Sequence, residues 1–226
     1  MDKLQAAKDD GKAVAVIFID LSKAFDNVQH QTLLLDLEKR HFAGSALAWI
    51  QDYLSNRFQH VVVDGQMSDF IPVAKGAPQG NVLGPTLFNV YISSLPDAVS
   101  SLPVEISSYA DDVTLCSIAS SIQEAIAVAA KAASTVGQYL AHRGLLMNVP
   151  KSCPILLGTH SADPCENLTC ENFSIPIVRS TKLLGVVIDD HLSHNHFSYV
   201  VAKVVRLDRF TVLGVCSIRM LGGCSL

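Results

Sequence analysis

The stretch SYADDVTLC (108–116) places two adjacent aspartates, Asp111 and Asp112, between two β-rich runs. The runs VEISSYA (104–110) and VTLCSI (113–118) look like buried strands and predict a hairpin whose turn holds the aspartate pair. Two carboxylates held beside a sheet repel each other strongly unless a positive group neutralises them. The turn is therefore a candidate cation site.

Two other Asp-Asp pairs in the same sequence serve as internal comparisons. Asp9-Asp10 lies among lysines and a glycine, and Asp189-Asp190 ends a strand-like run and enters the polar loop DHLSHNH (190–196). Charges in such polar surroundings are solvated at little cost. Neither of these pairs requires a function.

A third carboxylate, Asp20, follows a second buried run. The continuous apolar run AVAVIFI (13–19) predicts a buried strand whose carboxyl end delivers Asp20. Three carboxylates at one sheet edge would suit Mg²⁺ or Mn²⁺, and two such ions can activate a hydroxyl and hold a phosphate for displacement. The alternative is structural, with Asp111 as a turn residue and Asp20 as a helix cap.

The remaining sequence mixes helices, hairpins and strands. Helical periodicity or caps predict helices at 27–42, 45–54, 86–95 and 121–144, the last with a capping box of Ser121 and Glu124. Asp26 is the expected N-cap of the first helix, and Gly44 its expected end. Further strands are expected at 61–65 paired with 70–73, and at 153–158, 173–178 and 182–189. This order predicts an α+β fold with helices packed on one face of an antiparallel sheet.

Composition indicates a globular domain. The chain has 226 residues, 49% of them hydrophobic and 17% charged, which is enough for a substantial core. No apolar run approaches the roughly 20 residues that span a bilayer, so no membrane partner is expected. A mean hydropathy of +0.31 suggests an apolar face that a neighbouring domain covers.

Cysteine spacing and net charge limit the expected cellular compartment and the expected ligands. No signal-peptide pattern opens the chain and the six cysteines are irregularly spaced, so we expect an intracellular protein, in the nucleus or the cytoplasm. The net charge of −4 argues against a general nucleic-acid binder. Two bound divalent cations would offset that charge.

Three sequence blocks, in this order, resemble the palm of a reverse transcriptase of the non-long-terminal-repeat retrotransposon type. They are FIDLSKAFDNVQHQTLLLDL (18–37), GAPQGNVLGPTLFNVYISSLP (76–96) and YADD (109–112). The resemblance runs from about residue 13 to about residue 200. It implies a polymerase palm fold and an RNA-directed DNA polymerase, which adds deoxynucleotides to the 3′-hydroxyl of a DNA primer on an RNA template by a two-metal mechanism.

The same resemblance assigns the metal ligands. The carboxylates of Asp20, Asp111 and Asp112 would bind two Mg²⁺ or Mn²⁺ ions, and the backbone carbonyl of Leu21 would assist them. This is the set of carboxylates that the burial pattern also selects.

The nucleotide-binding residues follow from the resemblance in the same way. The ring of Phe25 would lie under the sugar of the incoming nucleotide and exclude a 2′-hydroxyl, and Gln79 and Gly80 would line the nascent base pair. A phenylalanine at this position can equally be a core residue. Asn81 stands where a small hydroxyl residue is more usual in the family.

Two more roles concern the leaving group and the primer. Lys151 resembles the lysine that protonates the departing pyrophosphate as general acid. The stretch KLLGVVID (182–189) resembles the primer grip, where Leu184 and Gly185 would hold the primer's 3′ end. Without the resemblance, Lys151 reads as a solvated lysine and 182–189 as an edge strand.

The expected organisation is that of a palm fragment. It comprises a polar N-terminal extension (1–12), a reverse transcriptase palm core (13–175), primer-grip-like strands (176–200) and the truncated start of a thumb (201–226). We expect contacts to fingers and thumb segments of a longer parent protein.

Three other functional classes compete with an active polymerase. A catalytically inactive palm fragment would act, if at all, by binding nucleic acid or a protein. A zinc module would need the histidines and cysteines of one segment, whose spacing matches structural zinc sites poorly: His191, His194, His196, Cys165 and Cys170. A nucleotide cyclase is disfavoured by the Pro-Gln-Gly block and the primer-grip-like stretch.

Overall fold

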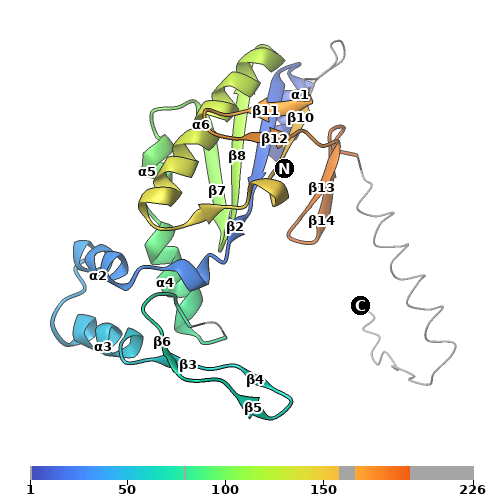
Figure 1. Cartoon of the computed structure of the whole chain (residues 1–226). Coiled ribbons are helices and arrows are strands. Elements are labelled where there is room, and N and C mark those ends of the chain that lie inside the picture. The colour runs from blue at the N-terminus through green and yellow to red at the C-terminus, as the bar shows by residue number, and fades with distance from the viewer. Residues whose placement is uncertain (1, 79, 158–165, 194–226) are drawn as a thin grey trace, which may run out of the picture. The chain divides into compact units, whose positions relative to one another are not determined.

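The computed structural model describes residues 2–78, 80–157 and 166–193 (Figure 1). The chain divides into two compact units, Met1–Val178 and Arg179–Leu226. Gln79, Cys165, His194, His196 and the expected start of a thumb at 201–226 lie outside the described residues.

A four-stranded antiparallel sheet forms the centre of the first unit. Its strands lie in the order β10 (Cys153–Leu157), β1 (Ala13–Ile19), β8 (Asp112–Ala119) and β7 (Val104–Tyr109). All seven residues of β1 are buried, because the strand has a neighbour on each side and apolar residues on both faces. The predicted hairpin around the aspartate pair is confirmed, but β7 is an edge strand of half-buried and exposed residues, not a buried one.

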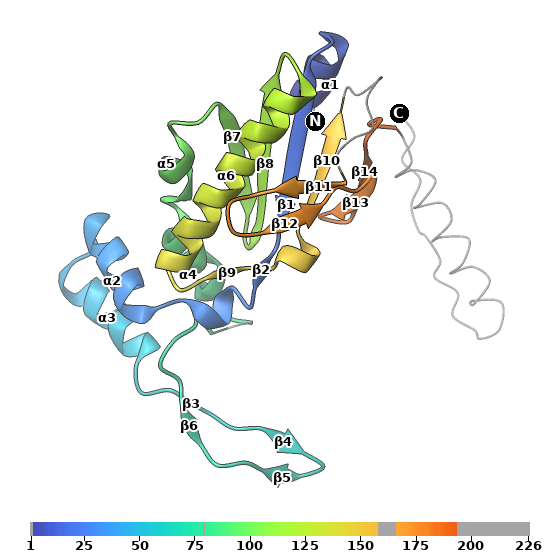
Figure 2. The ribbon, with the colours of Figure 1, turned by 45° about the horizontal axis from the view of Figure 1, so that its top comes forward.

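The helices are α1 (Asp2–Asp9), α2 (His30–Lys39), α3 (Gly44–Leu54), α4 (Leu83–Ile92), α5 (Leu95–Val99) and α6 (Ile122–His142), with 3₁₀ turns at Phe25–Asn27 and Val149–Lys151. In Figures 1 and 2, α6 crosses one face of the sheet, where it contacts β8 and β1, and α5 lies beside it. Most buried positions of α6 are alanines, so the helix can approach the sheet closely. The predicted N-cap is confirmed, because the Ser121 hydroxyl accepts a hydrogen bond from the Glu124 amide at 3.3 Å. The α+β palm fold with helices on one sheet face is the architecture observed.

The start of α2 differs from the prediction. Gln29 is its N-cap residue and provides no side-chain cap, while Asp26 lies within the 3₁₀ turn Phe25–Asn27. The chain is extended at Val28, whose carbonyl accepts a hydrogen bond from the Gly76 amide at 2.7 Å, so the helix cannot begin earlier. Gly44, the expected end of this helix, is instead the first residue of α3, with a φ of +59°.

A hairpin is present between α3 and α4, but the expected pairing of 61–65 with 70–73 is wrong, because the chain already reverses in a two-residue turn at Asp64 and Gly65, both with positive φ. Phe58–Gln59 (β3) pairs with Ile71–Pro72 (β6), and nearer the tip Val62–Val63 (β4) pairs with Gln66–Met67 (β5). The hairpin extends away from the sheet in Figure 2 and exposes several large apolar side chains, among them Val61, Val62, Val63, Met67, Phe70 and Ile71. These exposed residues account for part of the high mean hydropathy.

A buried ion pair joins α2 to the residue that follows α6. The Arg143 guanidinium bonds to the Asp36 carboxylate, and both side chains are 12% exposed. The same guanidinium lies 4.3 Å from the ring centre of Tyr91, whose hydroxyl donates to the Arg143 carbonyl. This cluster fixes α2, α4 and the end of α6 to one another.

Three short antiparallel strand pairs complete the described strands. In the first unit, β2 (Leu21–Ser22) pairs with β9 (Leu146–Met147), and β11 (Asn167–Thr169) pairs with β12 (Ser174–Pro176). In the second unit, β13 (Ser180–Leu183) pairs with β14 (Val186–Asp189). Among the described helices, none combines the length and the apolar character that crossing a bilayer requires.

Candidate active site

Asp20 is held at the end of β1 by the turn that precedes β10. The Asp20 amide donates to Ser152 Oγ at 3.2 Å, and its carbonyl accepts from the Asn148 amide at 2.8 Å. Its carboxylate Oδ2 accepts from Asn148 Nδ2 at 2.8 Å. Ser152 Oγ donates in turn to the Asn148 carbonyl at 2.9 Å, which closes the turn. Backbone and side chain of Asp20 are thus fixed together, and one carboxylate oxygen, Oδ1, is not used by Asn148.

Asn148 and Ser152, which hold Asp20 in place, are residues that the sequence reasoning missed. They lie more than 120 residues from Asp20 in the chain, and nothing local to them indicates that they contact it. The sequence signal for them is the family-like stretch GLLMNVPKS (144–152), which contains both residues as well as Lys151.

Asp111 and Asp112 occupy the β7–β8 turn. Tyr109 pairs with Asp112, so Ala110 and Asp111 form a two-residue loop. Ala110 has a φ of +52°, a positive value at the first loop position as in a type II′ turn. A non-glycine residue in this left-handed region is strained, and such strain is frequent at functional sites.

The sheet register brings Asp112 beside Asp20. Ile19 of β1 is opposite Val113 of β8, so Asp20 and Asp112 are the next residues on two neighbouring strands, and both are half-buried. Burial raises the pKa of the Asp112 carboxyl, and the negative charges of Asp111 and then Asp20 raise this pKa further. The charged forms of these carboxylates therefore destabilise one another at this end of the sheet.

The other Asp-Asp pairs lack this arrangement. Asp9 and Asp10 are exposed at the end of α1. Asp189 is buried, and its own loop supplies donors to its carboxylate, the amides of His191 and Ser193 at 3.1 and 2.8 Å and the Ser193 hydroxyl. Exposure confirms the interpretation of Asp9 and Asp10, whereas the expectation of a solvated Asp189 is wrong, because this carboxylate is buried and its own loop supplies the hydrogen bonds.

The chemistry of the donor set at Asp20, Asp111 and Asp112 suits a hard divalent cation. Mg²⁺ and Mn²⁺ prefer carboxylate oxygens, and a cation would relieve the mutual repulsion that raises the Asp112 pKa. Within residues 2–78, 80–157 and 166–193, however, no three His, Cys, Asp or Glu side chains are already arranged to hold one ion. The metal-ligand assignment, including the Leu21 carbonyl, therefore stays a prediction.

Two of the residues named for a zinc module, His191 and Cys170, lie in the described part of the chain. Neither belongs to a group of three potential metal ligands among the residues that the structure describes. Cys170 is buried, and burial raises the pKa of its thiol to about 11, which disfavours the thiolate that zinc requires.

Phe25 lies shortly after Asp20, in the 3₁₀ turn Phe25–Asn27. Its half-buried ring stacks on the buried ring of Phe88 with 4.6 Å between ring centres. The ring therefore packs against the core on one side, and part of it stays accessible, as a nucleotide contact would need. Its sugar-sensing role stays a prediction.

The Pro-Gln-Gly loop is anchored to this turn. The Ala77 amide donates to the Phe25 carbonyl at 2.8 Å, and the Gly76 carbonyl lies 2.9 Å from His30 Nε2. Gly76 has a φ of +98°, and a Cβ at this position would come 3.0 Å from the Asp26 carbonyl oxygen, so glycine is strongly favoured. The loop that leads to Gln79 and Gly80 thus starts beside Phe25. His30 is a further residue that the sequence reasoning missed.

Gly80 has a φ of +78°, which favours glycine, and a Cβ there would meet nothing within 4 Å. In the isolated chain, the positive φ alone therefore favours glycine at position 80, since a Cβ would not clash with any neighbour. The close approach to a base pair that the resemblance implies stays a prediction for Gly80, as it does for Gln79.

Lys151 is exposed and lies in the same turn as Asn148, which holds Asp20. The structure therefore ties the predicted general acid to the predicted metal ligand through a short segment. Its role as acid stays a prediction.

Leu184 and Gly185 form the two-residue loop of the β13–β14 hairpin in the second unit. Their φ values are +46° and +89°, as in a type I′ turn, and Leu184 is 57% exposed. Among the residues that the structure describes, Leu184 is not part of the hydrophobic core. Contact of this loop with a primer stays a prediction.

Comparison with known proteins gives concordant results. Residues 1–188 match the family described as reverse transcriptase (RNA-dependent DNA polymerase). The chain is 30% identical over 195 residues to the RNA-directed DNA polymerase from mobile element jockey of Drosophila melanogaster, covering 84% of this chain and 21% of that protein. It is 26% identical over 161 residues to the Pol polyprotein of the type-1 retrotransposable element R2 of Popillia japonica, covering 67% of this chain and 26% of that protein.

A solved structure supports the fold. The telomerase of Candida Tropicalis, truncated from its C-terminal domain, superposes with a TM-score of 0.57 at 12% identity, covering 85% of this chain and 38% of that chain. This likeness shows the palm fold alone. The chain spans about a fifth of the length of the jockey polymerase that it matches. With the family match over most of its length, the chain belongs to the reverse transcriptase (RNA-dependent DNA polymerase) family, of the non-long-terminal-repeat retrotransposon type.

Proposed function

We propose that this chain carries the polymerisation site of an RNA-directed DNA polymerase. The reaction is attack of a DNA primer 3′-hydroxyl on the α-phosphate of a deoxynucleoside triphosphate, templated by RNA, with pyrophosphate as the leaving group. The observation that carries the proposal is the register of β1 and β8, which places Asp20 beside Asp112 and its neighbour Asp111 at one end of the sheet.

Two Mg²⁺ or Mn²⁺ ions bound by Asp20, Asp111, Asp112 and the Leu21 carbonyl would lower the pKa of the primer hydroxyl and neutralise phosphate charge. The protein's part is to position these groups. Asn148 holds the Asp20 carboxylate by its amide, so less conformational freedom is lost when the reactants bind.

The remaining site residues act on the nucleotide and the leaving group. The Phe25 ring restricts the space beneath the sugar, and the loop anchored on the Phe25 carbonyl carries Gln79 and Gly80 to the base pair. Lys151 donates a proton to the departing pyrophosphate. Template sequence is read by base pairing, and the protein contacts the backbone.

In this proposal, fingers and thumb segments of a longer parent protein complete the enzyme. The chain spans 21% of the jockey polymerase, and its β3–β6 hairpin exposes a run of apolar side chains. We propose that these segments of the parent protein cover the exposed apolar side chains of the hairpin.

Primer extension tests the proposal. The purified chain is given a DNA primer on an RNA template, deoxynucleoside triphosphates and either Mg²⁺ or Mn²⁺, and is compared with the variant Asp111→Asn, Asp112→Asn. The matched control is Asp9→Asn, Asp10→Asn, because that pair has the same composition and is exposed. We expect extension by the wild type and the control, and a loss of at least about 100-fold in the variant.

Two results would contradict this function. Folded wild-type chain that extends no primer would leave an inactive palm fragment, and equal extension by the Asp111→Asn, Asp112→Asn variant would place the chemistry elsewhere. Circular dichroism of all three proteins establishes that they are folded.

A further inference from the structure

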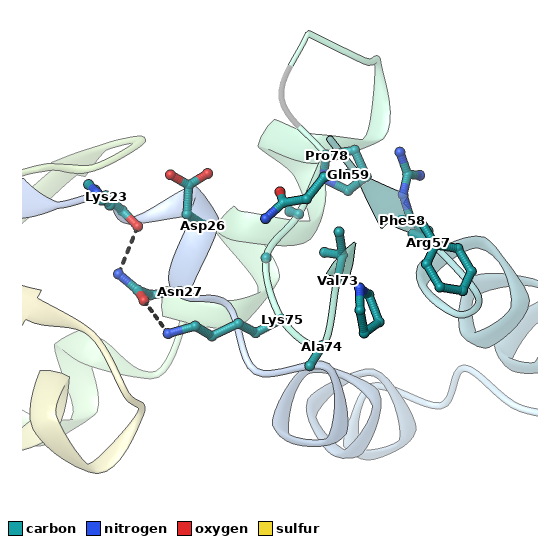
Figure 3. A pocket seen from close by; sticks show the side chains of 13 residues that line it. Lys23, Asp26, Asn27, Arg57, Phe58, Gln59, Val73, Ala74, Lys75 and Pro78 are labelled. Atoms are coloured by element: carbon teal, nitrogen blue, oxygen red, sulfur yellow. Dashed lines mark hydrogen bonds between the residues drawn. The ribbon is translucent and has the colours of Figure 1, made fainter. Parts of the chain in front are cut away.

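Hydrogen bonds attach the start of the Pro-Gln-Gly loop, residues 75–77, to the segment 25–28 that follows Asp20 in the chain. One of them, visible in Figure 3, runs from Lys75 Nζ to Asn27 Oδ1 at 2.8 Å. Two more join backbone groups: the Gly76 amide donates to the Val28 carbonyl at 2.7 Å, and the Ala77 amide donates to the Phe25 carbonyl at 2.8 Å. Each residue of 75–77 is thus bonded to the turn after Asp20.

His30, the first residue of α2, adds a further hydrogen bond to this attachment. Its Nε2 lies 2.9 Å from the Gly76 carbonyl oxygen. A carbonyl oxygen can only accept, so Nε2 carries the hydrogen and donates it. Val28 and His30 together therefore satisfy both backbone polar groups of Gly76. The imidazole is half-buried, which partly shields this bond from water.

The peptide unit between Gly76 and Ala77 is held from both sides. The Gly76 carbonyl and the Ala77 amide belong to one plane, because the peptide bond is planar. His30 donates to the carbonyl oxygen of this plane, and the Phe25 carbonyl accepts from its N–H, so the orientation of the plane is fixed. Without the His30 hydrogen bond, the plane would keep only the bond to Phe25 and could tilt about it.

The other end of the loop is anchored at the start of α4. The Gly84 amide donates to Asn81 Oδ1 at 2.6 Å, and a Cβ at Gly84 would lie 2.7 Å from the Pro78 carbonyl oxygen. The short stretch between Ala77 and Asn81 therefore has both of its ends fixed. Because this stretch is so short, a tilt of the 76–77 peptide cannot be absorbed within it and is passed on to Gly80.

We propose that His30 is a positioning residue for the incoming nucleotide. By holding the 76–77 peptide, its imidazole fixes the loop that carries Gln79 and Gly80 relative to Phe25, the residue expected beneath the sugar. His30 acts through the loop and not on the reacting atoms, since the hydrogen on its Nε2 is committed to a backbone carbonyl. This inference rests on the proposed polymerase function, which identifies the ligand of the loop as a nucleotide.

The variants His30→Leu and His30→Gln separate the hydrogen bond from the rest of the side chain. The glutamine Nε2 is as many bonds from Cα as the histidine Nε2 and keeps a donor, whereas leucine has none. Leucine and glutamine have similar helix propensities, so they affect the start of α2 alike. The matched control is His142→Leu, because His142 is exposed and lies in the last turn of α6.

Hydrogen–deuterium exchange of the full chain, read at single residues by mass spectrometry, measures the attachment of the loop without any substrate. We expect His30→Leu to speed exchange of the Gly76 and Ala77 amides about 3- to 10-fold, the effect of losing one hydrogen bond against local opening. His30→Gln and His142→Leu should stay within about twofold of the wild type. Amides of α6 report wider unfolding, so equal acceleration there in His30→Leu would overturn the proposal by showing a general loss of stability.

Primer extension tests the effect on the nucleotide. His30→Leu should raise the KM for the deoxynucleoside triphosphate about 3- to 10-fold and change kcat less than about threefold, because other elements hold the carboxylates. His30→Gln should restore the KM of the wild type.

Two outcomes would overturn the role of His30. One is unchanged exchange of the Gly76 and Ala77 amides in His30→Leu, and the other is faster exchange with an unchanged KM, which would leave His30 a structural residue only. The polymerase proposal fails separately. A wild-type chain that extends no primer rejects that function, and the exchange rates then still decide whether His30 holds the loop.

Discussion

Replacing Asp112 with asparagine is expected to stabilise the metal-free chain at neutral pH. Asp112 is half-buried, and its carboxylate faces the negative charges of Asp111 and Asp20. The change Asp112→Asn keeps the shape of the side chain and removes one of three mutually repelling charges. The proposed cation site is thereby expected to be more stable once one of its carboxylates is neutral.

The pH dependence follows from the direction of the pKa shift. The pKa of Asp112 in the folded chain is raised above its ordinary value of 3.8, by burial first and then by the two carboxylates. Well below pH 3.8, Asp112 is protonated in both the folded and the unfolded chain, so it does not lower the free energy of unfolding. As the pH rises from there through the folded pKa, the unfolded chain ionises more readily, so stability is lost and the full penalty is present at pH 7.

The magnitude is modest, because the group is partly solvated. Like-charge neighbours at such sites cost about 0.2–1 kcal/mol each, and screening by water reduces their sum. We expect Asp112→Asn to add about 0.5–1 kcal/mol to the free energy of unfolding at pH 7, or about 1–4 °C in Tm.

Thermal unfolding in EDTA, followed by circular dichroism at pH 7 and at about pH 3, measures the effect. Asp10→Asn is the control, because Asp10 is exposed and its contact with Lys12 is long, at 3.9 Å. A variant that is less stable than the wild type at pH 7, or equally stabilised at both pH values, would show that the charge of Asp112 does not destabilise the folded chain.

Three further changes have expected outcomes that urea unfolding can measure. Arg143→Met should lower the free energy of unfolding by about 3 kcal/mol, because the Asp36 carboxylate then keeps only the exposed Lys39, at 3.7 Å, as a charged partner; a loss below about 1 kcal/mol would contradict this. Asn148→Ala should cost about 1 kcal/mol and also slow primer extension, because Asp20 loses its amide donor, and unchanged extension would show that this hydrogen bond does not position Asp20. Ser121→Ala should cost about 1 kcal/mol through loss of the α6 N-cap, and unchanged stability would mean that another group replaces the cap.

The main elements of the fold could be predicted from the sequence because their signals are local. Seven consecutive apolar residues ending at Asp20 predict a central buried strand, which is β1. The β-rich runs on either side of Asp111 and Asp112 predict the β7–β8 hairpin, and Ser121 marks the start of α6. The neighbouring positions of Asp20 and Asp112 then follow from antiparallel pairing.

The parts that could not be predicted depend on contacts between distant segments. The late start of α2 results from the hydrogen bond between Val28 and Gly76, which no helix propensity encodes. The exposed position of β7 depends on the order of strands in the sheet, and an edge strand and a central strand can share the same alternating pattern. The contacts of Asn148 and Ser152 with Asp20 could not be predicted either, because these residues lie far from Asp20 in the sequence.

The proposed function requires that Asp20, Asp111 and Asp112 bind divalent cations together, and electron paramagnetic resonance of Mn²⁺ measures this binding. Free Mn²⁺ gives a signal that falls as the ion is bound, so titration of the full chain measures the affinity. We expect the wild type and Asp9→Asn, Asp10→Asn to bind Mn²⁺ alike, and Asp111→Asn, Asp112→Asn to bind it at least about tenfold more weakly. Equal Mn²⁺ binding by all three proteins would show that Asp111 and Asp112 are not metal ligands.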